Sequence, residues 1–262
     1  FVRGELGTHF IEREAGLAAE TRRIVEEAQS PGGWLCPLPD GRKKVAAIAA
    51  VTATIGGHMD EKRKVLLVAT LDSKEIETRF IRERLEENGL TVYLLDAGIR
   101  RTVDGGAHIT PDQIAAAVGT TMPEIRALNH EGKCMALMIQ GAIKCAHELH
   151  DQVGFSGIIA AGGSGGTTLG AAVMRTFPFG LPKVLISTMA SGMTKPFVGT
   201  KDIVMLNSIC DVAGLNTVTR RVFENGALAL AGMAKGYRPV ETSGKPVATM
   251  TTLSVTDACC NR

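Results

Sequence analysis

Short apolar runs alternate with longer amphipathic stretches over most of this chain, and this alternation constrains its fold more than any other feature. The apolar runs at residues 64–71, 90–98, 155–162, 182–190 and 201–208 are rich in Val, Ile and Leu. Apolar strands that alternate with helices indicate a parallel sheet that is covered on both faces. We therefore predict an α/β fold, a Rossmann-like three-layer sandwich around a mostly parallel sheet.

The two ends of the chain do not share this alternation. Residues 1–58 contain a charged stretch, a Pro- and Gly-rich stretch and a short apolar run, which we interpret as an N-terminal extension or fusion remnant with a linker. Residues 59–240 form the predicted α/β lobe. Residues 241–262 contain one more strand-like run, at 245–255, with no helix after it. We interpret this run as the first strand of a second, truncated α/β lobe.

Composition argues against several functional classes. The 262 residues carry a formal net charge of +2 at pH 7, so no strong basic field indicates nucleic acid. No apolar stretch reaches the roughly 18 residues that a membrane span needs. The six cysteines show no CxxC pair and no zinc-type spacing with histidine, which favours reduced thiols inside a cell. We expect a cytoplasmic protein that binds neither nucleic acid nor membrane and holds no metal through its own clusters.

The segment AAGGSGGTTLG, residues 160–170, stands where an apolar strand gives way to a helix. In a parallel sheet, ligands bind beyond the carboxyl ends of the strands. Successive glycines let several backbone N–H groups converge, and together with a helix N-terminus these attract an anion such as phosphate. A tight turn that merely needs glycine is the alternative interpretation. The predicted anion-binding residues here are Gly162, Gly163, Ser164, Gly165, Gly166, Thr167 and Thr168.

Two known phosphate-binding fingerprints fit this segment poorly. A P-loop has a lysine after its last glycine, whereas Thr167 follows Gly166 here. The dinucleotide fingerprint has Gly or Ala where Thr168 stands, and an acidic residue at the end of the next strand, which instead ends in STMASG. The segment therefore predicts an anion site without indicating a standard P-loop NTPase or a classical NAD enzyme.

Three other strand ends carry residues that we include in the predicted site. Lys74 supplies the positive charge that the glycine segment lacks, or else it is a solvated residue of a first helical turn. Asp96 is placed to bind a ribose hydroxyl, or else it caps a helix or turn. The remaining members are Thr70, Asp72, Ser73, Thr188, Ser191 and Gly192. The sequence supplies no clear catalytic acid, base or metal set, and a nucleophilic Ser164 would need a histidine base that cannot be placed, so no reaction is assigned.

Several segments together resemble a known family. They are TLDSKEIE, GGSGGTTL, PKVLISTMASG, VGTKDIVMLNSICDVAGLN and KPVATMTTLSVT. They resemble an otherwise uncharacterised family of ATP-binding domains, typified by the N-terminal region of a plant protein that confers resistance to tomato mosaic virus. The likeness covers residues 59–262. Residues 1–12 resemble the closing segment of a biotin carboxylase domain.

The resemblance implies a two-lobed α/β domain that binds ATP, with or without Mg²⁺, and that forms homo-oligomers, often dimers. It also implies association with a TIM-barrel partner protein or domain. The leading hypothesis is a nucleotide-binding protein of unassigned reaction. Two alternatives stay open: a protein-interaction module whose glycine segment is only a turn, and an enzyme that acts on a phosphorylated or carboxylated small molecule.

Overall fold

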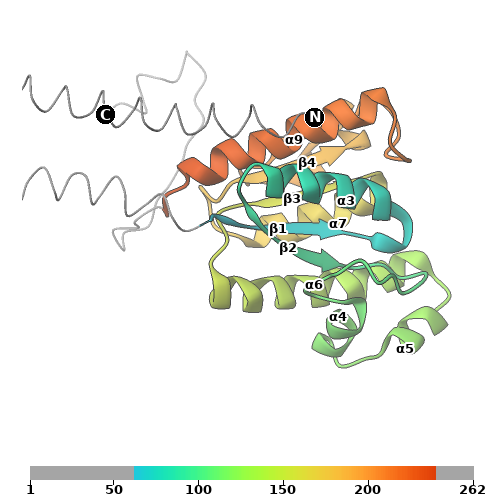
Figure 1. Cartoon of the computed structure of the whole chain (residues 1–262). Coiled ribbons are helices and arrows are strands. Elements are labelled where there is room, and N and C mark those ends of the chain that lie inside the picture. Colours follow the sequence, from blue (N-terminus) through green and yellow to red (C-terminus); the bar gives the residue numbers. More distant parts are fainter. Residues whose placement is uncertain (1–61, 240–262) are drawn as a thin grey trace, which may run out of the picture. The chain divides into compact units, whose positions relative to one another are not determined.

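A computed structural model describes residues 62–239 of the chain. The predicted extension at residues 1–58 and the predicted strand at 245–255 lie outside the described residues. In chain order the described elements (Figure 1) are β1 Lys64–Ala69, α3 Leu71–Glu87, β2 Thr91–Asp96, α4 Pro111–Ala117, α5 Met122–Ala127, α6 Glu131–Val153, β3 Ile158–Gly162, α7 Ser164–Thr176, β4 Lys183–Ser187, the 3₁₀ helix η1 Thr188–Ser191, α8 Lys195–Val198, β5 Val204–Asn207 and α9 Thr217–Gly236.

The described strands form one parallel sheet in the order β2-β1-β3-β4-β5. Helices α3 and α9 pack together on one face, and α4, α6 and α7 cover the other, with α5 beside α4 and α6 (Figure 1). The prediction of an α/β, Rossmann-like sandwich with three layers is therefore confirmed. The order is that of the flavodoxin-like group of doubly wound folds.

The order in which successive strands are added to the sheet reverses in its middle. From β1 the chain passes through α3 to β2 on one side, whereas β3, β4 and β5 follow one another on the other side. Parallel crossovers are right-handed almost without exception, so a change of direction requires a change of face. This is why α3 lies on one face while α6 and α7 lie on the other. The reversal falls between β1 and β3, which are neighbours in the sheet.

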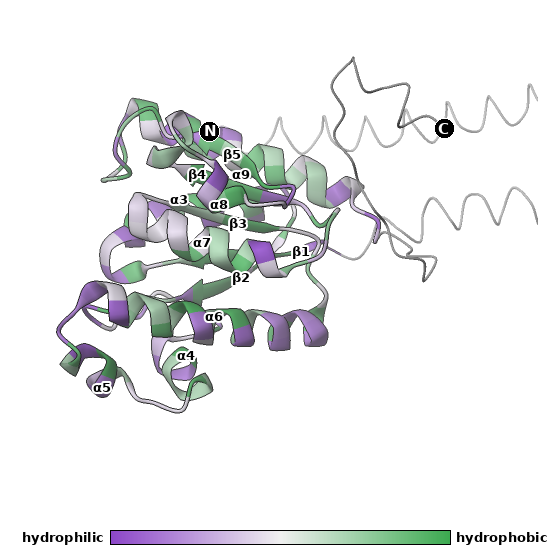
Figure 2. Ribbon diagram, turned by 180° about the vertical axis from the view of Figure 1, so that it is seen from behind, coloured by the Kyte–Doolittle hydropathy of each residue, from purple (hydrophilic) through white to green (hydrophobic). Residues whose placement is uncertain are grey.

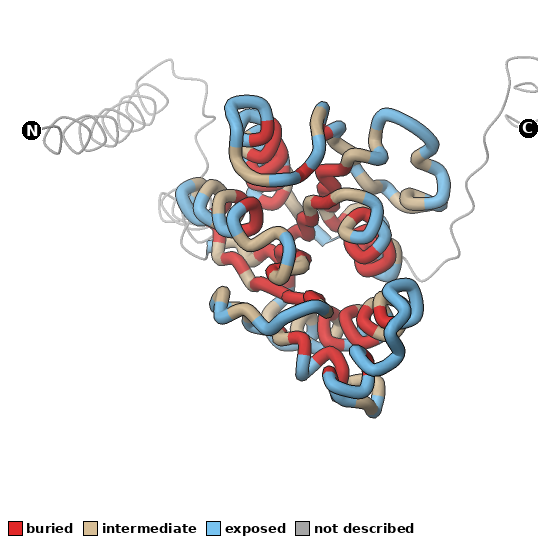
Figure 3. Tube along the Cα trace, turned by 90° about the vertical axis from the view of Figure 1, so that its right-hand side faces the viewer, coloured by how far each residue is buried: buried red, intermediate tan, exposed pale blue. Residues whose placement is uncertain are grey.

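Alternate residues of each central strand supply two separate cores. Leu66 and Val68 of β1 face the layer that contains α6 and α7, while Val65 and Leu67 face α3 and α9. Figure 2 shows apolar strands between helices whose outer sides are largely polar, and Figure 3 shows that burial is concentrated in the sheet and on the inner sides of the helices. Among the described helices, none is long and apolar enough to cross a membrane.

Local capping signals explain the short helices, one of which sequence reasoning missed. The segment TPDQIAAAVG, residues 110–119, predicts a short helix from its Thr cap and early Pro. In the structure Thr110 caps α4 and exchanges hydrogen bonds with Gln113. Thr121 caps α5 in the same way with Glu124. The signature Thr-Met-Pro-Glu was present in the sequence, but α5 is only six residues long and shows no helical periodicity that could be recognised.

A buried lysine stabilises the start of β4. Lys183, at the start of β4, is fully buried. Its Nζ donates to the carbonyl oxygens of Pro178 and Leu181, each at 2.8 Å, and to Oδ1 of Asp202 at 2.9 Å. The three ammonium donors are thus satisfied, which is the condition for burying such a charge. Burial alone would raise the pKa of Asp202, but hydrogen bonds from Lys183 and from the Gly180 N–H outweigh it and hold this pKa below its ordinary value.

We predict that Asp202→Asn lowers the free energy of unfolding by about 1–3 kcal/mol at neutral pH, because the buried ammonium loses its counter-charge. A depressed folded-state pKa contributes stability above the unfolded pKa, and this is lost as pH falls through the folded pKa. The difference in the free energy of unfolding between the wild type and the variant should therefore become smaller below about pH 4, as measured by urea titrations. If this difference in the free energy of unfolding stays the same in acid, Asp202 does not stabilise the fold through its negative charge.

Candidate functional site

A cleft opens at the carboxyl ends of β1, β2 and β3. Its walls are formed by residues 70–74 after β1, 97–100 after β2 and 162–166 at the end of β3 and the start of α7. A further wall is formed by residues 126–135, which run from the end of α5 into the first turns of α6. Its volume is about 490 Å³. Because the crossovers leave β1 and β3 toward opposite faces, none of the described helices covers the space between these two strand ends, which is where ligands bind in doubly wound folds.

The fold brings together most of the residues that the sequence predicted for the site. Those that line the cleft are Thr70, Asp72, Ser73, Lys74, Gly162, Gly163, Ser164, Gly165 and Gly166. The cleft lining does not include Asp96, Thr167, Thr168, Thr188, Ser191 or Gly192.

The glycine segment is shorter as a loop than the sequence suggested. Helix α7 begins at Ser164, and Gly163 is its N-cap residue, with no side-chain capping bond. The residues that follow form the first turn of the helix. The first N–H groups of a helix have no intrahelical partner, so in this turn they lie exposed at the cleft.

Two of the glycines are required by close packing. A Cβ atom on Gly162 would lie 2.8 Å from Cα of Gly166, and one on Gly166 would lie 3.3 Å from the carbonyl oxygen of Ala161. Further along α7, a Cβ on Gly170 would lie 2.6 Å from Cβ of Ala160. These glycines allow α7 to approach β3 closely, so the alternative interpretation of a tight turn accounts for Gly162 and Gly166.

The other two glycines have no such packing requirement. A Cβ on Gly163 would come no closer than 3.9 Å to Oγ1 of Thr188, and one on Gly165 no closer than 3.9 Å to Cε of Met135. Neither residue adopts a positive φ. What their missing side chains provide is space above the N-terminus of α7, which is what an anion held by backbone N–H groups needs.

The hydroxyl residues next to the glycines support the backbone. Oγ1 of Thr167 is buried, 2.6 Å from Oγ of Ser187 and 3.3 Å from the carbonyl oxygen of Gly162. Thr168 donates to the carbonyl oxygen of Ser164 at 2.8 Å. These bonds tie the start of α7 to the ends of β3 and β4. Ser191 and Gly192 lie at the end of η1, outside the cleft lining.

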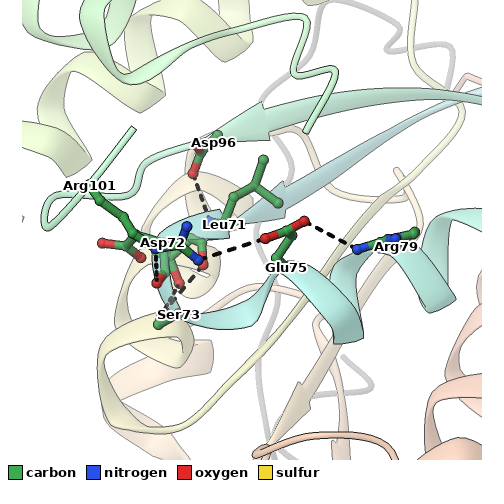
Figure 4. A network of polar contacts seen from close by, with 8 residues as sticks. Leu71, Asp72, Ser73, Glu75, Arg79, Asp96 and Arg101 are labelled. Atoms are coloured by element: carbon green, nitrogen blue, oxygen red, sulfur yellow. Dashed lines mark hydrogen bonds and ion pairs between the residues drawn. The ribbon is translucent and has the colours of Figure 1, made fainter. Parts of the chain in front are cut away.

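Asp96 joins the ends of β1 and β2 from behind the cleft. It is fully buried, and its Oδ1 accepts the N–H group of Leu71 at 2.8 Å (Figure 4). The same oxygen accepts the N–H group of Gly98 at 2.9 Å. Its Oδ2 has no hydrogen-bond partner among the described residues. Burial raises the pKa of this carboxyl, and the two N–H groups offset that only in part. Its observed contacts are thus those of a backbone clamp, as in the alternative interpretation of a cap.

Asp72 and Lys74 enter the cleft from the first turns of α3. Oδ2 of Asp72 accepts the backbone N–H groups of Ile99 and Arg100, both at 2.8 Å, and so holds the segment after β2 against the end of β1. Lys74 has non-helical backbone angles inside α3, with φ −132° and ψ 32°. It makes no ion pair with any residue between 62 and 239, so its positive charge is not neutralised by the described part of the protein.

Sequence reasoning missed the wall between α5 and α6. Arg100, Arg126, His130 and Glu131 line the cleft there, together with apolar side chains such as Met135. Of these, Arg100 directly follows the DAGI segment at the end of β2 and could have been found in that way. Arg126 lies in α5, a helix that was not predicted, and His130 and Glu131 come directly after it at the start of α6, so no local signal in the sequence placed them at the site.

The cleft contains a serine, although the structure shows no catalytic partner for it. Gly162, Ser164 and Gly166 have the G-x-S-x-G spacing of a nucleophile elbow. His130 lines the same cleft, but its Nδ1 accepts the N–H of Lys133 as a helix cap, and Ser164 hydrogen-bonds no histidine among the described residues. Within residues 62–239 no group of three or more His, Cys, Asp or Glu side chains could hold a metal ion.

Fold and cleft define a doubly wound α/β protein with a candidate anion-binding site at the point where its strand order reverses. Residues 63–239 match the model of the uncharacterised protein family UPF0261, N-terminal domain, and the chain belongs to this family.

The chain is similar to several bacterial and plant proteins. It is 36% identical to the UPF0261 protein of Clostridium tetani over 194 residues, which cover 74% of this chain and 48% of that protein. It is 34% identical to the UPF0261 protein mlr3387 of Mesorhizobium japonicum over 75% of this chain and 48% of that protein. The chain thus spans about half the length of these relatives.

Two tomato proteins of opposite phenotype also match. The ToMV resistance protein Tm-1(GCR237) and the ToMV susceptible protein tm-1(GCR26) of Solanum lycopersicum are 30% and 31% identical to this chain. Each match covers 76% of this chain and 29% of the tomato protein. The likeness is therefore to a domain that both forms share and does not separate resistance from susceptibility.

The two kinds of glycine in α7 should respond differently to the same substitution. Gly170→Ala places Cβ against Ala160 and Leu185 and should lower the free energy of unfolding by about 1–3 kcal/mol. Gly165→Ala meets nothing closer than 3.9 Å and should leave stability unchanged or raise it by up to about 1 kcal/mol. Urea denaturation of both variants measures the difference. Equal losses in both would show that Gly165 is also needed for packing.

Asp96→Asn should make stability less dependent on pH. A raised folded-state pKa contributes stability below the unfolded pKa, and this is lost as pH rises through the folded pKa. The asparagine oxygen can still accept from Leu71 and Gly98 but cannot ionise, so the free energy of unfolding of the variant should rise relative to that of the wild type as pH increases above about 4. Asp96→Ala, which removes the acceptor, should lose about 1–3 kcal/mol at every pH. Parallel stability curves for wild type and Asp96→Asn would refute this.

Proposed function

We propose that this chain binds a nucleotide, and ATP in the first place, in the cleft at the carboxyl ends of β1, β2 and β3. One observation carries the proposal. Gly163 and Gly165 have no packing requirement for glycine, and they stand where the first N–H groups of α7 meet the cleft. Space above a helix N-terminus suits a phosphate group, and Lys74, which has no ion-pair partner in the described part of the chain, lines the same cleft.

The rest of the cleft is consistent with a ligand of nucleotide size. Its volume of about 490 Å³ lies within the usual range for small-molecule sites. Ile99, Cys134 and Met135 give it an apolar part on which a base or sugar can rest. If Mg²⁺ accompanies the phosphates, Asp72 and Glu131 are the carboxylates at hand, and phosphate oxygens and water supply the other ligands.

We also propose that the protein works in the cytoplasm as a homo-oligomer. The described cysteines Cys134, Cys145 and Cys210 are free thiols, which suits a reducing compartment. Large apolar side chains are exposed in and around the edge strand β5, among them Val204 and Ile209, and such surfaces favour association. The match covers 48% of each of the two bacterial relatives, whose remaining length leaves room for a further partner domain, for which a TIM barrel is our proposal.

A thermal-shift screen of the 262-residue chain with nucleotides and phosphorylated or carboxylated metabolites tests the ligand class. A ligand that binds only the folded state adds about 2.7 kcal/mol at one hundred times its dissociation constant. Stabilisation by nucleotides supports the proposal. Stabilisation by small carboxylates or sugar phosphates alone would favour an enzyme of such compounds, and no stabilisation at all would favour a protein-interaction module.

Gly165→Asp should weaken ATP binding at least tenfold, about 1.4 kcal/mol, because it puts a bulky negative charge over the α7 N–H groups. Gly192→Asp is the matched control. Gly192 lies outside the cleft lining, and a Cβ there meets nothing within 4 Å. Calorimetry should show that this second variant binds ATP like the wild type. If the two variants behave alike, the N-terminus of α7 is not the phosphate site.

A further inference from the structure

One arginine of the cleft is held in place by a hydrogen bond and yet has no acidic partner among residues 62–239. Arg126, at the end of α5, donates from Nε to the carbonyl oxygen of Ile99 at 2.7 Å. The same segment is fixed from its other side, because Asp72 accepts the N–H groups of Ile99 and Arg100. The guanidinium is thus anchored to a wall of the cleft that is itself tied to the end of β1.

Two other arginines of this region face carboxylates, and Arg126 differs from them. Arg100 faces Glu131 at 3.6 Å, and Arg101 faces Glu75 at 3.7 Å. Arg126 forms no ion pair within the described range 62–239. Its remaining N–H donors form the planar fork that matches phosphate or carboxylate oxygens. Anchoring through Nε reduces the side-chain entropy that would be lost when an anion binds.

The anchored arginine and the N-terminus of α7 stand on different sides of the cleft. Arg126 is tied to the segment after β2, whereas α7 follows β3, and β1 lies between these two strands. Neighbouring strands are about 4.8 Å apart, so the ends of β2 and β3 are separated by roughly 10 Å. A ligand with one phosphate can satisfy one of the two groups, while a chain of phosphates is suited to both.

We infer that Arg126 binds the terminal phosphate of a nucleoside polyphosphate whose inner phosphates lie at the N-terminus of α7. This inference rests on the proposed nucleotide site and adds its specificity. Arg126 selects triphosphates over monophosphates, and Asp72 acts as a positioning residue that orients Arg126 through Ile99.

Calorimetry with ATP, ADP and AMP tests this on the complete 262-residue chain. The wild type should bind ATP at least tenfold more tightly than AMP. Arg126→Gln should lose about tenfold in ATP affinity and less than twofold in AMP affinity. Arg126→Lys keeps the charge but lacks the planar fork, so its ATP affinity should lie between that of the wild type and that of Arg126→Gln. Arg101→Gln is the control, because Arg101 lies outside the cleft lining, and it should keep the preference of the wild type.

The outcomes separate this inference from the proposed function. If Arg126→Gln weakens all three nucleotides equally, or none of them, the terminal-phosphate role is wrong while nucleotide binding stands. If the wild type binds ATP and AMP equally well, the preference itself is absent and the inference fails. If the wild type binds no nucleotide, both proposals fail together. Melting curves of each variant confirm that losses of affinity occur in folded protein.

Discussion

The right-handedness of the β-α-β crossovers determines where the cleft of this protein lies. Because each crossover has the same hand, a chain that turns from one side of the sheet to the other must change faces. It does so between β1 and β3, and the helices that leave these neighbouring strands diverge. The cleft is the space that this divergence leaves uncovered. Two of its walls, the glycine segment and the start of α3 that carries Lys74, come together because β1 and β3 are adjacent.

The cleft is kept in shape by backbone N–H groups that bind to carboxylates. Asp96 holds the N–H groups of Leu71 and Gly98, and Asp72 holds those of Ile99 and Arg100. Together they connect the segments that follow β1 and β2, and a further bond carries this connection to Arg126. These N–H groups have no hydrogen-bond partner within a strand or helix. Burying them without a partner would cost free energy, and the two carboxylates prevent this. Two acidic residues that looked like ligand contacts in the sequence therefore hold the framework of the site.

The glycines show how one motif serves packing and binding at once. Gly162, Gly166 and Gly170 recur every four residues and let α7 lie close against β3. Gly163 and Gly165 fall between them and on the cleft side, where no protein atom needs the space. The interpretations of an anion site and of a tight turn are thus not exclusive, since each applies to different members of the same segment.

The sequence by itself determined the layers of this fold and one wall of its cleft. Continuous apolar strands, Thr and Pro at the start of α4, and the glycine segment after β3 are local signals with a local physical cause, and they predicted the elements well. The tertiary structure alone decided that Thr167 is buried against Ser187, that Asp96 lies behind the cleft, and that Arg126 lies in its wall. These placements depend on strand order and on which residues distant in sequence become neighbours. Such contacts arise from the packing of whole elements, so no pattern within a short stretch of sequence records them.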